Sequence, residues 1–465
     1  MHKTTLIFLL IFQWSFSQTV ETINHHGTPI SMERLLQKYI QIKSISGEEK
    51  EAGDFLKNVC KENGLFISDF GVKNGNYNFA ASIFPLNTQK PNIVFLHHLD
   101  VVPEINGDNS VPYSGEIKND KIYGRGAVDN KGVGLMQLFG IIHSINSETL
   151  IEDNYNVTFL AVSCEETQCS GGASYVINNH LNELNPTVII GEGPSELTTL
   201  IGGEFNNPIF GVSVAHKRSF WLELKLEVET IGHSSITPLS YANQDMVKSL
   251  NKLTKKKNKI HFTDLNTGVL KAIGNHKKGM EKLVLTNPKL FKSVIKSKLR
   301  KKPELLALFT NTITLTSISS NSDVHNMIPS TATATLDCRL LPQTDEGEFL
   351  RMIKKRLDND AIKVTIVKKM NKSTPSETDS QYFVNFKKAI QTFNPTTEIL
   401  PILIPNINDL GMFRAKGIPS YASIPVNLSR HELECIHNLN EHISIPLLYD
   451  GANTYLNFIN RMQAI

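Results

Sequence analysis

Short apolar runs alternate with segments of helical spacing in the first half of the chain. Apolar residues recur with the period of an α-helix over residues 31–45 and 46–63. Ser46 and Glu49 match a capping box, in which each side chain satisfies a free backbone N–H at the helix start. Strands are predicted at 78–84, 92–96, 156–162 and 187–190, and helices at 130–145 and 172–184. This alternation predicts an α/β fold with a central, mostly parallel sheet covered by helices.

The pattern changes from about Phe210 onward. Residues 219–228 alternate apolar and polar side chains, as a half-buried strand does. Further elements are predicted in the order helix 242–253, strands 311–317 and 331–339, helix 346–357 and strand 362–367. A βαββαβ order favours a small antiparallel sheet with helices on one face. We therefore expect a second, α+β domain inserted into the first, which resumes with a helix at 380–393.

A lysine-rich segment at about 252–305 interrupts this second domain. Apolar residues recur within it at helical spacing, namely Leu283, Val284, Leu290, Phe291 and Val294. Such a segment is either a basic surface for anionic partners or a solvated amphipathic helical insertion. The pattern favours the insertion, because charge runs usually mark a solvated face.

Length and composition are those of a globular protein with two domains. A chain of 465 residues exceeds what one hydrophobic core usually supports. Hydrophobic residues make up 40% and charged residues 20%, and the net charge is +3. Nucleic-acid binding would require a basic stripe with interleaved aromatic residues, so we expect no nucleic-acid partner.

The N-terminus has the pattern of a secretory signal peptide. Lys3 precedes an apolar run from Leu6 to Phe16 that is too short to span a bilayer, and Ser17 lies at the expected cleavage point. A buried N-terminal strand and a membrane anchor are the alternatives. We predict that residues 1–17 are removed and that the protein is exported to the periplasm or beyond, with no stable membrane insertion afterwards.

Cysteine usage leaves one question open. Five cysteines are too few and too scattered for a disulfide scaffold. Cys164 and Cys169 flank an acidic pair and could form a bridge, which the sequence does not decide. Cys60, Cys338 and Cys435 are expected to be buried free thiols.

Histidine and acidic side chains follow several predicted strands at their carboxyl ends, where open α/β sheets hold their ligands. His98 and Asp100 follow one strand, Glu165 and Glu166 the next, and Glu192 a third. Asp129 lies at the entrance of the helix predicted at 130–145. Imidazole and carboxylate groups suit zinc. Taken singly, acidic residues on loops are more often only solvated, so the order of the motifs decides the interpretation.

Two motifs carry a family resemblance. His98-Leu99-Asp100 followed by Val-Val-Pro, and Asp129 within Gly-Arg-Gly-Ala-Val-Asp-Asn-Lys-Gly, are followed in order by the glycine-rich turn Ser170-Gly171-Gly172. Together they resemble the dinuclear zinc exopeptidase and deacylase family, which includes aminoacylase, carboxypeptidase G, succinyl-diaminopimelate desuccinylase and the carboxypeptidase S group. The resemblance covers nearly the whole mature chain.

The resemblance implies a division into domains. A catalytic domain would occupy residues 18–210 and 373–465. Between its two parts, residues 211–372 would form a ferredoxin-like lid or dimerisation domain, through which a homodimer is possible. In an open conformation the lid residues would lie too far from the metal ligands to act.

It also implies a ligand set for two zinc ions, which cobalt or manganese could replace. Asp129 would bridge the ions, with His98 and Glu192 on one ion and Glu166 and His437 on the other. Glu165 would be the general base, and Asp100 would accept the second ring N–H of His98. His97, on the opposite side of its strand, is expected only to pack. Relatives hold the peptide after the bridging aspartate in cis, so a cis Asp129–Asn130 bond is expected.

Three lid residues match family positions. His233, in Ile231-Gly-His-Ser-Ser, would stabilise the oxyanion, often from a partner subunit. Asn326 and Arg339 would hold a substrate carboxylate, for which the planar guanidinium of arginine is suited. The alternative is that these are structural strand residues.

The function implied is hydrolysis of an amide bond next to a free carboxylate in a small peptide, as in a dipeptidase or carboxypeptidase. An N-acyl-amino-acid deacylase is the nearest alternative. A metal-free binding protein on the same fold is an alternative of another class, against which the complete ligand set argues.

Overall fold

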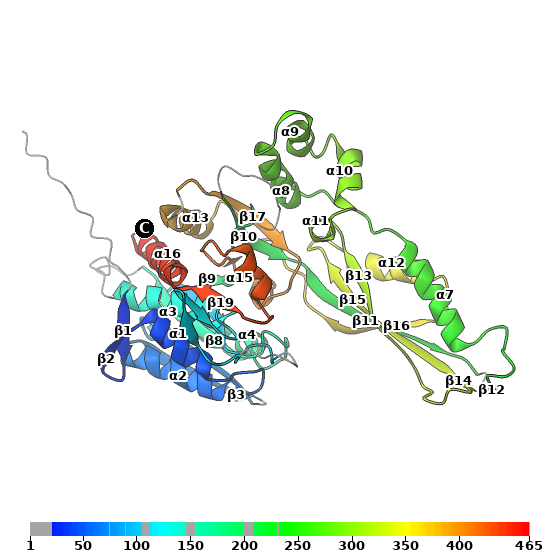
Figure 1. Cartoon of the computed structure of the whole chain (residues 1–465), viewed down its shortest axis with the longest axis horizontal. Coiled ribbons are helices and arrows are strands. Elements are labelled where there is room, and N and C mark those ends of the chain that lie inside the picture. Colours follow the sequence, from blue (N-terminus) through cyan, green and yellow to red (C-terminus); the bar gives the residue numbers. More distant parts are fainter. Residues whose placement is uncertain are drawn as a thin grey trace, which may run out of the picture.

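The computed structural model describes residues 21–73, 75–88, 90–104, 111–145, 154–198, 208–229, 232–393 and 395–464. The expected signal peptide, residues 1–17, lies outside the described residues. The described chain forms a rounded body built on a large sheet and a narrower arm built on a small sheet (Figure 1). Among the described residues, no helix is long and apolar enough to cross a membrane.

The body is organised around an eight-stranded mixed sheet in the order β17-β10-β18-β9-β5-β8-β4-β3. Strand β5 pairs in parallel with β8 and β9, and β9 pairs in parallel with β18. The carboxyl ends of β9, β5 and β8 therefore meet at one edge. The strands are β3 (Phe66–Lys73), β4 (Asn76–Ser82), β5 (Asn92–His98), β8 (Asn156–Val162), β9 (Pro186–Gly191), β10 (Ile209–His216), β17 (Glu398–Ile404) and β18 (Ser420–Ala422).

Helices cover both faces of this sheet, as predicted. One hydrophobic core joins a sheet face to α1 (Met32–Gln41), α2 (Lys50–Glu62), α3 (Lys131–Ile145), α13 (Gln381–Phe393) and α16 (Ile445–Gln463). A second core joins the other face to α4 (Ala173–Asn179) and α14 (Leu410–Arg414). Because α3 lies between α1, α16 and the sheet, it is buried on nearly all sides.

The predicted helix at 172–184 is two helices, α4 and α5 (Leu181–Leu184), which meet at His180. The predicted capping box of Ser46 and Glu49 is wrong. Helix α2 begins at Lys50, Ser46 donates its hydroxyl hydrogen to Asp100, and Glu49 accepts a hydrogen bond from the backbone of Gly47. A tertiary contact therefore uses the side chain of Ser46, and a turn before the helix uses that of Glu49.

The arm has the predicted βαββαβ order and a ferredoxin-like arrangement. Its antiparallel sheet has the order β13-β15-β11-β16. One face packs on α7 and α12 through residues that alternate along the strands, such as Phe220, Leu222, Leu224 and Leu336. The elements are β11 (Arg218–Glu227), α7 (Ala242–Lys255), β13 (Thr312–Ser320), β15 (Thr331–Leu340), α12 (Glu346–Leu357) and β16 (Lys363–Lys369).

The junction between body and arm lies after β10. Residues 209–216, most of which fall in the span expected for the second domain, form a strand of the large sheet and pair with β17. The small sheet starts only at Arg218. We propose that the chain has two domains and that it passes from one to the other at Lys217. This residue is buried and donates hydrogen bonds to Ala307 O and Thr312 Oγ1.

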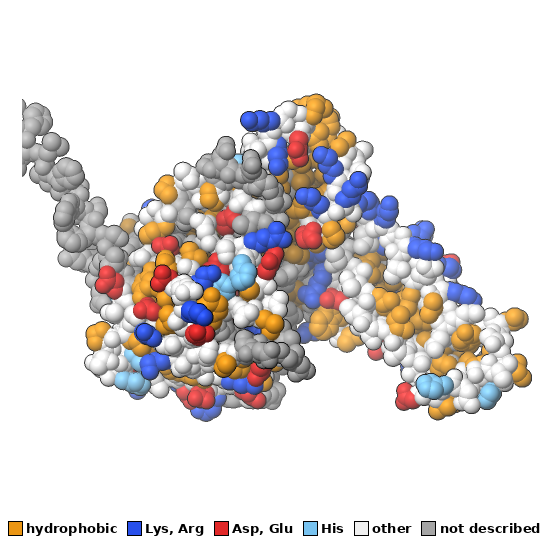
Figure 2. Space-filling view, viewed as in Figure 1, with side chains coloured by type: hydrophobic (Ala, Val, Ile, Leu, Met, Phe, Trp, Pro, Cys, Tyr) orange, Lys and Arg blue, Asp and Glu red, His pale blue; other side chains and the backbone are white. Residues whose placement is uncertain are grey.

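The lysine-rich segment folds as four helices, α8 (Asp264–Asn275), α9 (Gly279–Thr286), α10 (Lys292–Leu299) and α11 (Pro303–Ala307). Val284 is buried in the insertion's own core, and Phe291 packs partly against it. Leu283, Leu290 and Val294 remain exposed. In Figure 2, lysine and arginine side chains gather over this part of the molecule, with hydrophobic side chains between them. The segment is thus a helical insertion with a charged, partly apolar surface.

The remaining elements are short. An N-terminal hairpin pairs β1 (Thr22–His25) with β2 (Thr28–Ser31), and β19 (His442–Ser444), β7 (Lys121–Tyr123) and β6 (Glu116–Lys118) form a three-stranded sheet. Helix α15 (Arg430–Cys435) precedes β19. At the end of the arm farthest from the large sheet, β12 (Gly232–His233) pairs with β14 (Met327–Ile328) (Figure 1).

Candidate metal centre

Three neighbouring strands of the large sheet deliver side chains to one edge. His98 is the last residue of β5, Glu165 and Glu166 follow β8, and Glu192 follows β9. Since β5 lies between β8 and β9, these side chains converge. The sequence had predicted this, because each residue follows an apolar run.

His98 is at the centre of the first ligand triad. Its Nε2 lies 3.1 Å from Asp129 Oδ1 and 3.3 Å from Glu192 Oε2. The ring is almost fully buried, and its Nδ1 donates a hydrogen bond of 3.0 Å to the backbone oxygen of Asp100. That carbonyl therefore fixes the orientation of the ring more closely than the Asp100 carboxylate, whose Oδ1 is 3.5 Å away.

His437 forms the second triad on the other side of Asp129. Its Nε2 lies 3.0 Å from Asp129 Oδ2 and 3.1 Å from Glu166 Oε1. Asp129 thus contributes one oxygen to each triad, which is the geometry expected of a bridging carboxylate. The peptide bond between Asp129 and Asn130 is cis, as the resemblance led us to expect.

The charges of these groups fit a site built for cations. Contacts with Asp129 and Glu166 raise the pKa of His437 to about 10. Burial lowers the pKa of His98, but the charge of Glu192 and hydrogen bonds to acidic groups outweigh it and leave that pKa well above its ordinary value. Burial and the charge of Asp129 raise the pKa of Glu192 to about 7. Clustered buried carboxylates with these pKa shifts attract positive charge.

The ligand atoms of the two triads are of the kinds that bind zinc. Each triad offers one imidazole nitrogen and two carboxylate oxygens, which are zinc ligands. Glu166 Oε1 is buried and has no other hydrogen-bond partner among the described residues. Each histidine Nε2 faces only carboxylates, so a metal ion could take the place of its proton, since imidazole binds metal as the neutral ring.

The carboxylate of Asp100 organises the loop after β8. Its Oδ1 accepts a hydrogen bond from the backbone N–H of Glu165, and its Oδ2 accepts one from that of Glu166, each 3.1 Å long. Ser46 Oγ donates to the same Oδ2 at 2.7 Å. Asp100 therefore connects the strand that carries His98 to the loop that carries both glutamates.

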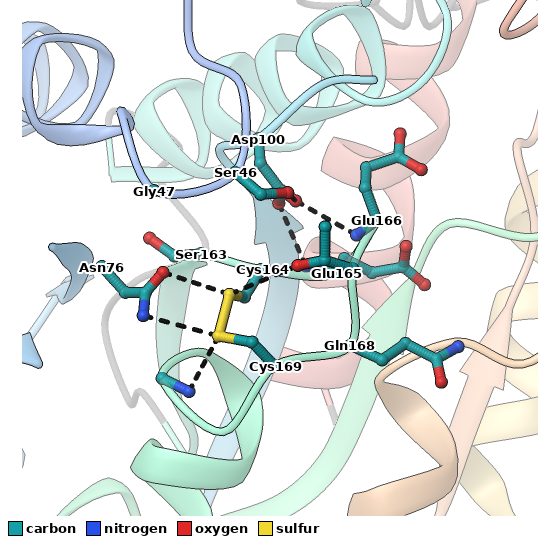
Figure 3. The surroundings of a disulfide bond; sticks show 12 residues. Ser46, Gly47, Asn76, Asp100, Ser163, Cys164, Glu165, Glu166, Gln168 and Cys169 are labelled. Carbon is teal, nitrogen blue, oxygen red and sulfur yellow. Dashed lines mark hydrogen bonds between the residues drawn. A yellow bond between two sulfur atoms is a disulfide. The ribbon is translucent and has the colours of Figure 1, made fainter. Parts of the chain in front are cut away.

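That loop is closed by a disulfide bond between Cys164 and Cys169, which settles the question left open by the sequence. Figure 3 shows the sulfur atoms on one side of the loop and the carboxylates of Glu165 and Glu166 extending to the other. The remaining cysteines, Cys60, Cys338 and Cys435, are buried free thiols, as predicted.

Glu165 lies among other acidic groups. Burial raises the pKa of its carboxyl well above the ordinary value, and the charges of Glu192 and Asp409 add to the shift, while His98 opposes it. A carboxyl that holds a proton more strongly is suited to move protons near neutral pH.

Two residues that the sequence did not single out support the site. Glu441 is buried and accepts hydrogen bonds from the backbone N–H groups of Gly126, Val128 and Asp129 and from Arg125 Nη1. It therefore fixes the loop that presents Asp129. The only sequence signal was its place four residues after His437.

The second is Asp409, which precedes α14. It is buried, its Oδ2 has no hydrogen-bond partner among the described residues, and burial raises its pKa to about 7. No motif of the sequence pointed to it.

The three lid residues are separated by the structure. His233 and Asn326 lie together at the far end of the arm, where β12 pairs with β14. Asn326 Nδ2 donates a hydrogen bond of 3.1 Å to His233 Nε2. Arg339 lies near the junction instead, opposite Ser219, and donates two hydrogen bonds to Asp337 of 2.8 and 3.0 Å. His233 and Asn326, assigned to different tasks, thus form one unit, while Arg339 is apart from them.

Other histidines have structural partners. His97 is buried against Tyr39, whose hydroxyl lies 2.9 Å from its Nε2, and so packs as expected. His431, Cys435 and His442 lie close together beside His437. However, His442 Nδ1 donates to the backbone oxygen of Asn440 and Nε2 accepts from Lys121, so both ring nitrogens are satisfied within the protein.

Residues 94–461 match the model of peptidase family M20/M25/M40. The chain belongs to this family. It is therefore a metal-dependent hydrolase, and the resemblance to zinc exopeptidases and deacylases is confirmed.

Relatives of this M20 chain include peptidases and acyl-amino-acid hydrolases. It is 24% identical over 400 residues to probable carboxypeptidase S-like 2 of Dictyostelium discoideum, covering 83% of this chain and 75% of that protein. It is 25% identical over 393 residues to the N-fatty-acyl-amino acid synthase/hydrolase PM20D1 of Mus musculus, covering 81% and 76%.

Solved structures confirm the fold. The M20 family metallo-carboxypeptidase Sso-CP2 from Sulfolobus solfataricus matches with a TM-score of 0.68 at 22% identity, covering 93% of this chain and 99% of that one. Human carnosine dipeptidase 1 matches with a TM-score of 0.63 at 16% identity, covering 93% and 96%.

Proposed function

We propose that this chain is an exported dizinc exopeptidase that hydrolyses an amide bond next to a free carboxylate in small peptides. The observation that carries the proposal is the pair of triads that share Asp129, with His98 Nε2 at 3.1 Å from one oxygen and His437 Nε2 at 3.0 Å from the other. Glu165 offers an oxygen within 4.8 Å of ligand atoms of His98 and Glu192, and among the described residues it forms no ion pair with either histidine of the triads. This leaves it available as a base.

In this proposal, His98, Glu192 and Asp129 hold one ion, and Glu166, His437 and Asp129 hold the other. Two bound zinc ions would polarise the scissile carbonyl and lower the pKa of water. Glu165 takes a proton from the attacking water and returns it to the leaving amine. Asp100 keeps Glu165 and Glu166 in place through their backbone N–H groups. Arg339, once its fork is released from Asp337, binds the free carboxylate of the substrate.

A second candidate is an N-acyl-amino-acid deacylase. The mouse relative is named an N-fatty-acyl-amino acid synthase/hydrolase, and its bond also lies next to a carboxylate-bearing amino acid. Both reactions use the same centre. A metal-free binding protein is excluded as a class by membership in a family of metal-dependent hydrolases.

The test is a zinc measurement combined with a substrate panel. The purified mature protein should hold about two equivalents of zinc and hydrolyse dipeptides, with loss of activity on chelation and recovery with zinc. N-acetyl and N-palmitoyl amino acids form the second arm of the panel, and amide-capped versions of each substrate are the control. Faster turnover of the acylated amino acids selects the deacylase, and no turnover in either arm by a zinc-loaded protein overturns the proposal.

A further inference from the structure

The loop from Cys164 to Cys169 contains the general base and a metal ligand of the proposed function, and a disulfide closes it. Glu165 and Glu166 lie directly after Cys164, which is almost fully buried, whereas Cys169 is partly exposed. The backbone has positive φ angles at Cys164 and Gln168, 70° and 50°. Residues other than glycine rarely adopt such angles, so this conformation needs outside support.

The body supplies part of that support. Asn76 Nδ2 donates a hydrogen bond of 3.4 Å to Cys169 Sγ, opposite the contacts that Asp100 makes with the two glutamates (Figure 3). Space next to the loop is also restricted. A Cβ at Gly172 would lie 1.7 Å from the backbone oxygen of Ser163, and one at Gly171 would lie 2.0 Å from Asn76 Nδ2. The sulfur side of the loop is therefore packed tightly against β4 and β8.

The arm contacts the same loop. Lys368, near the end of β16, donates a hydrogen bond of 3.0 Å to the backbone oxygen of Gln168, and its ammonium lies 5.0 Å from the Trp221 ring. Between the arm and the body is a cavity of 340 Å³ that is lined by Gln168, Cys169 and Lys368. Cys169 of the disulfide thus lines this cavity, and a hydrogen bond from Lys368 joins the loop to the arm.

We propose that Cys164, Cys169 and Lys368 are positioning residues, with the disulfide aiming Glu165 and Glu166 and Lys368 linking their loop to the arm. The catalytic part of this inference rests on the proposed reaction, whereas its effect on metal binding rests only on the proposed role of Glu166 as a ligand. A simple stabilising bond is the competing explanation. The loop closed by the disulfide is short, with a sequence separation of 5, so the entropy that it removes from the unfolded chain is smaller than for a long loop. Its effect should therefore be local.

The experiment compares the wild-type protein with Cys164→Ser/Cys169→Ser. The double variant should lose about tenfold or more in affinity for one of two zinc ions, as expected when groups that orient a ligand are removed. In turnover, kcat should fall by about tenfold while KM changes by less than about threefold, because the base is misdirected and the substrate contacts remain. Cys60→Ala, which removes a buried thiol in the core beside α2, is the matched control and should retain both values.

Reduction of the wild-type protein answers the same question if the double variant does not fold. Tris(carboxyethyl)phosphine gives two electrons to the S–S bond and breaks it. One water molecule supplies the oxygen of the resulting phosphine oxide and the protons of the two thiols. Reduced wild-type protein should behave like the double variant, and reoxidation should restore it. The reagent should leave the double variant unchanged, which controls for removal of metal by the phosphine.

Lys368→Met tests the contact from the arm. Methionine retains packing over Trp221 and removes the donor to Gln168. We expect kcat to fall by about threefold, with zinc content unchanged, because one hydrogen bond is lost. Lys369→Met is the matched control, since the neighbouring lysine pairs with Glu346 on α12 instead.

The outcomes separate this inference from the proposed function. Wild-type zinc affinities and kcat in the double variant and in the reduced protein would overturn the positioning role, whatever the substrate. A wild-type protein that turns over no amide, but whose reduction still releases one zinc ion, would overturn the proposed function and leave the loop assignment in place.

Discussion

Asp129 is the residue on which the two triads depend. Each of its carboxylate oxygens faces a different histidine, so Asp129→Ala removes a ligand from both ions at once. We expect both equivalents of zinc and all activity to be lost together, as measured by elemental analysis and by turnover. Asp69→Ala, at a surface ion pair with Lys57, is the control and should retain both. An Asp129→Ala protein with full zinc content would contradict the bridging role.

Glu165 should act without binding metal. Glu165→Gln retains the shape of the side chain and removes the base, so the rate constant should fall by about 10²–10⁴-fold while the zinc content stays unchanged. Steady-state kinetics and elemental analysis on the same preparation test both halves. Loss of zinc in this variant would make Glu165 a ligand, and a large residual rate would transfer the role of base to another group.

Glu441 should affect zinc indirectly. It accepts three backbone N–H groups around Asp129, and glutamine would place an amide N–H against one of these donors. Glu441→Gln should therefore weaken zinc affinity by about 10–100-fold, as is typical of groups that orient ligands. Competition with a chromophoric chelator measures the change. Unchanged zinc affinity in a folded variant would show that the loop keeps its shape without this carboxylate.

At the scale of residues, the sequence predicted the members of the candidate site that lie in short sequence motifs. His98, Asp129, Glu166, Glu192 and His437 meet in space as two triads, although their assignment as ligands stays a prediction. Glu441 and Asp409 were missed because their surroundings come from segments remote in sequence. Glu441 contacts a loop more than three hundred residues earlier, and no local pattern reports such a contact.

At the scale of elements, long periodic segments were predicted well, since apolar spacing reports the buried face directly. The strands β5, β8 and β15 and the helices α3 and α12 begin and end within two residues of the expected positions. Very short strands were missed, such as β7, β18 and β19, because three residues show no period. The two-residue strand β12 was recognised only as a motif around His233.

The ion pair between Arg339 and Asp337 on the arm's sheet leads to a prediction about substrate binding. Asp337 accepts hydrogen bonds from Nε and Nη2 of Arg339, so a substrate carboxylate that approaches this edge of the guanidinium must compete with it. Asp337→Asn should therefore lower KM for substrates with a free carboxylate, and Arg339→Ala should raise it, by about tenfold each way at most. Amide-capped analogues should show neither effect. Equal effects of Arg339→Ala on capped and free substrates would return Arg339 to a structural role.

At the scale of the whole molecule, the arm separates groups that the reaction would need together. The unit formed by His233 and Asn326 lies at the end of the arm farthest from the large sheet, whereas the two triads lie in the body (Figure 1). The sequence assigned these residues to a second predicted domain but could not give this arrangement. For His233 to stabilise the oxyanion, either a large closure of the arm or a second copy of the chain must bring the unit to a metal centre.

We expect the second copy to supply it, and a mixing experiment tests this. His233→Ala and Glu165→Gln should each be nearly inactive alone. In a mixed dimer, the subunit with intact Glu165 would receive His233 from its partner, so one of two sites would be restored. Random mixing after dissociation and reassociation should then recover about a quarter of wild-type activity. Light scattering must show a dimer under the same conditions. A monomer, or a dimer without recovery, would mean that the arm closes on its own body and that His233 acts within one chain.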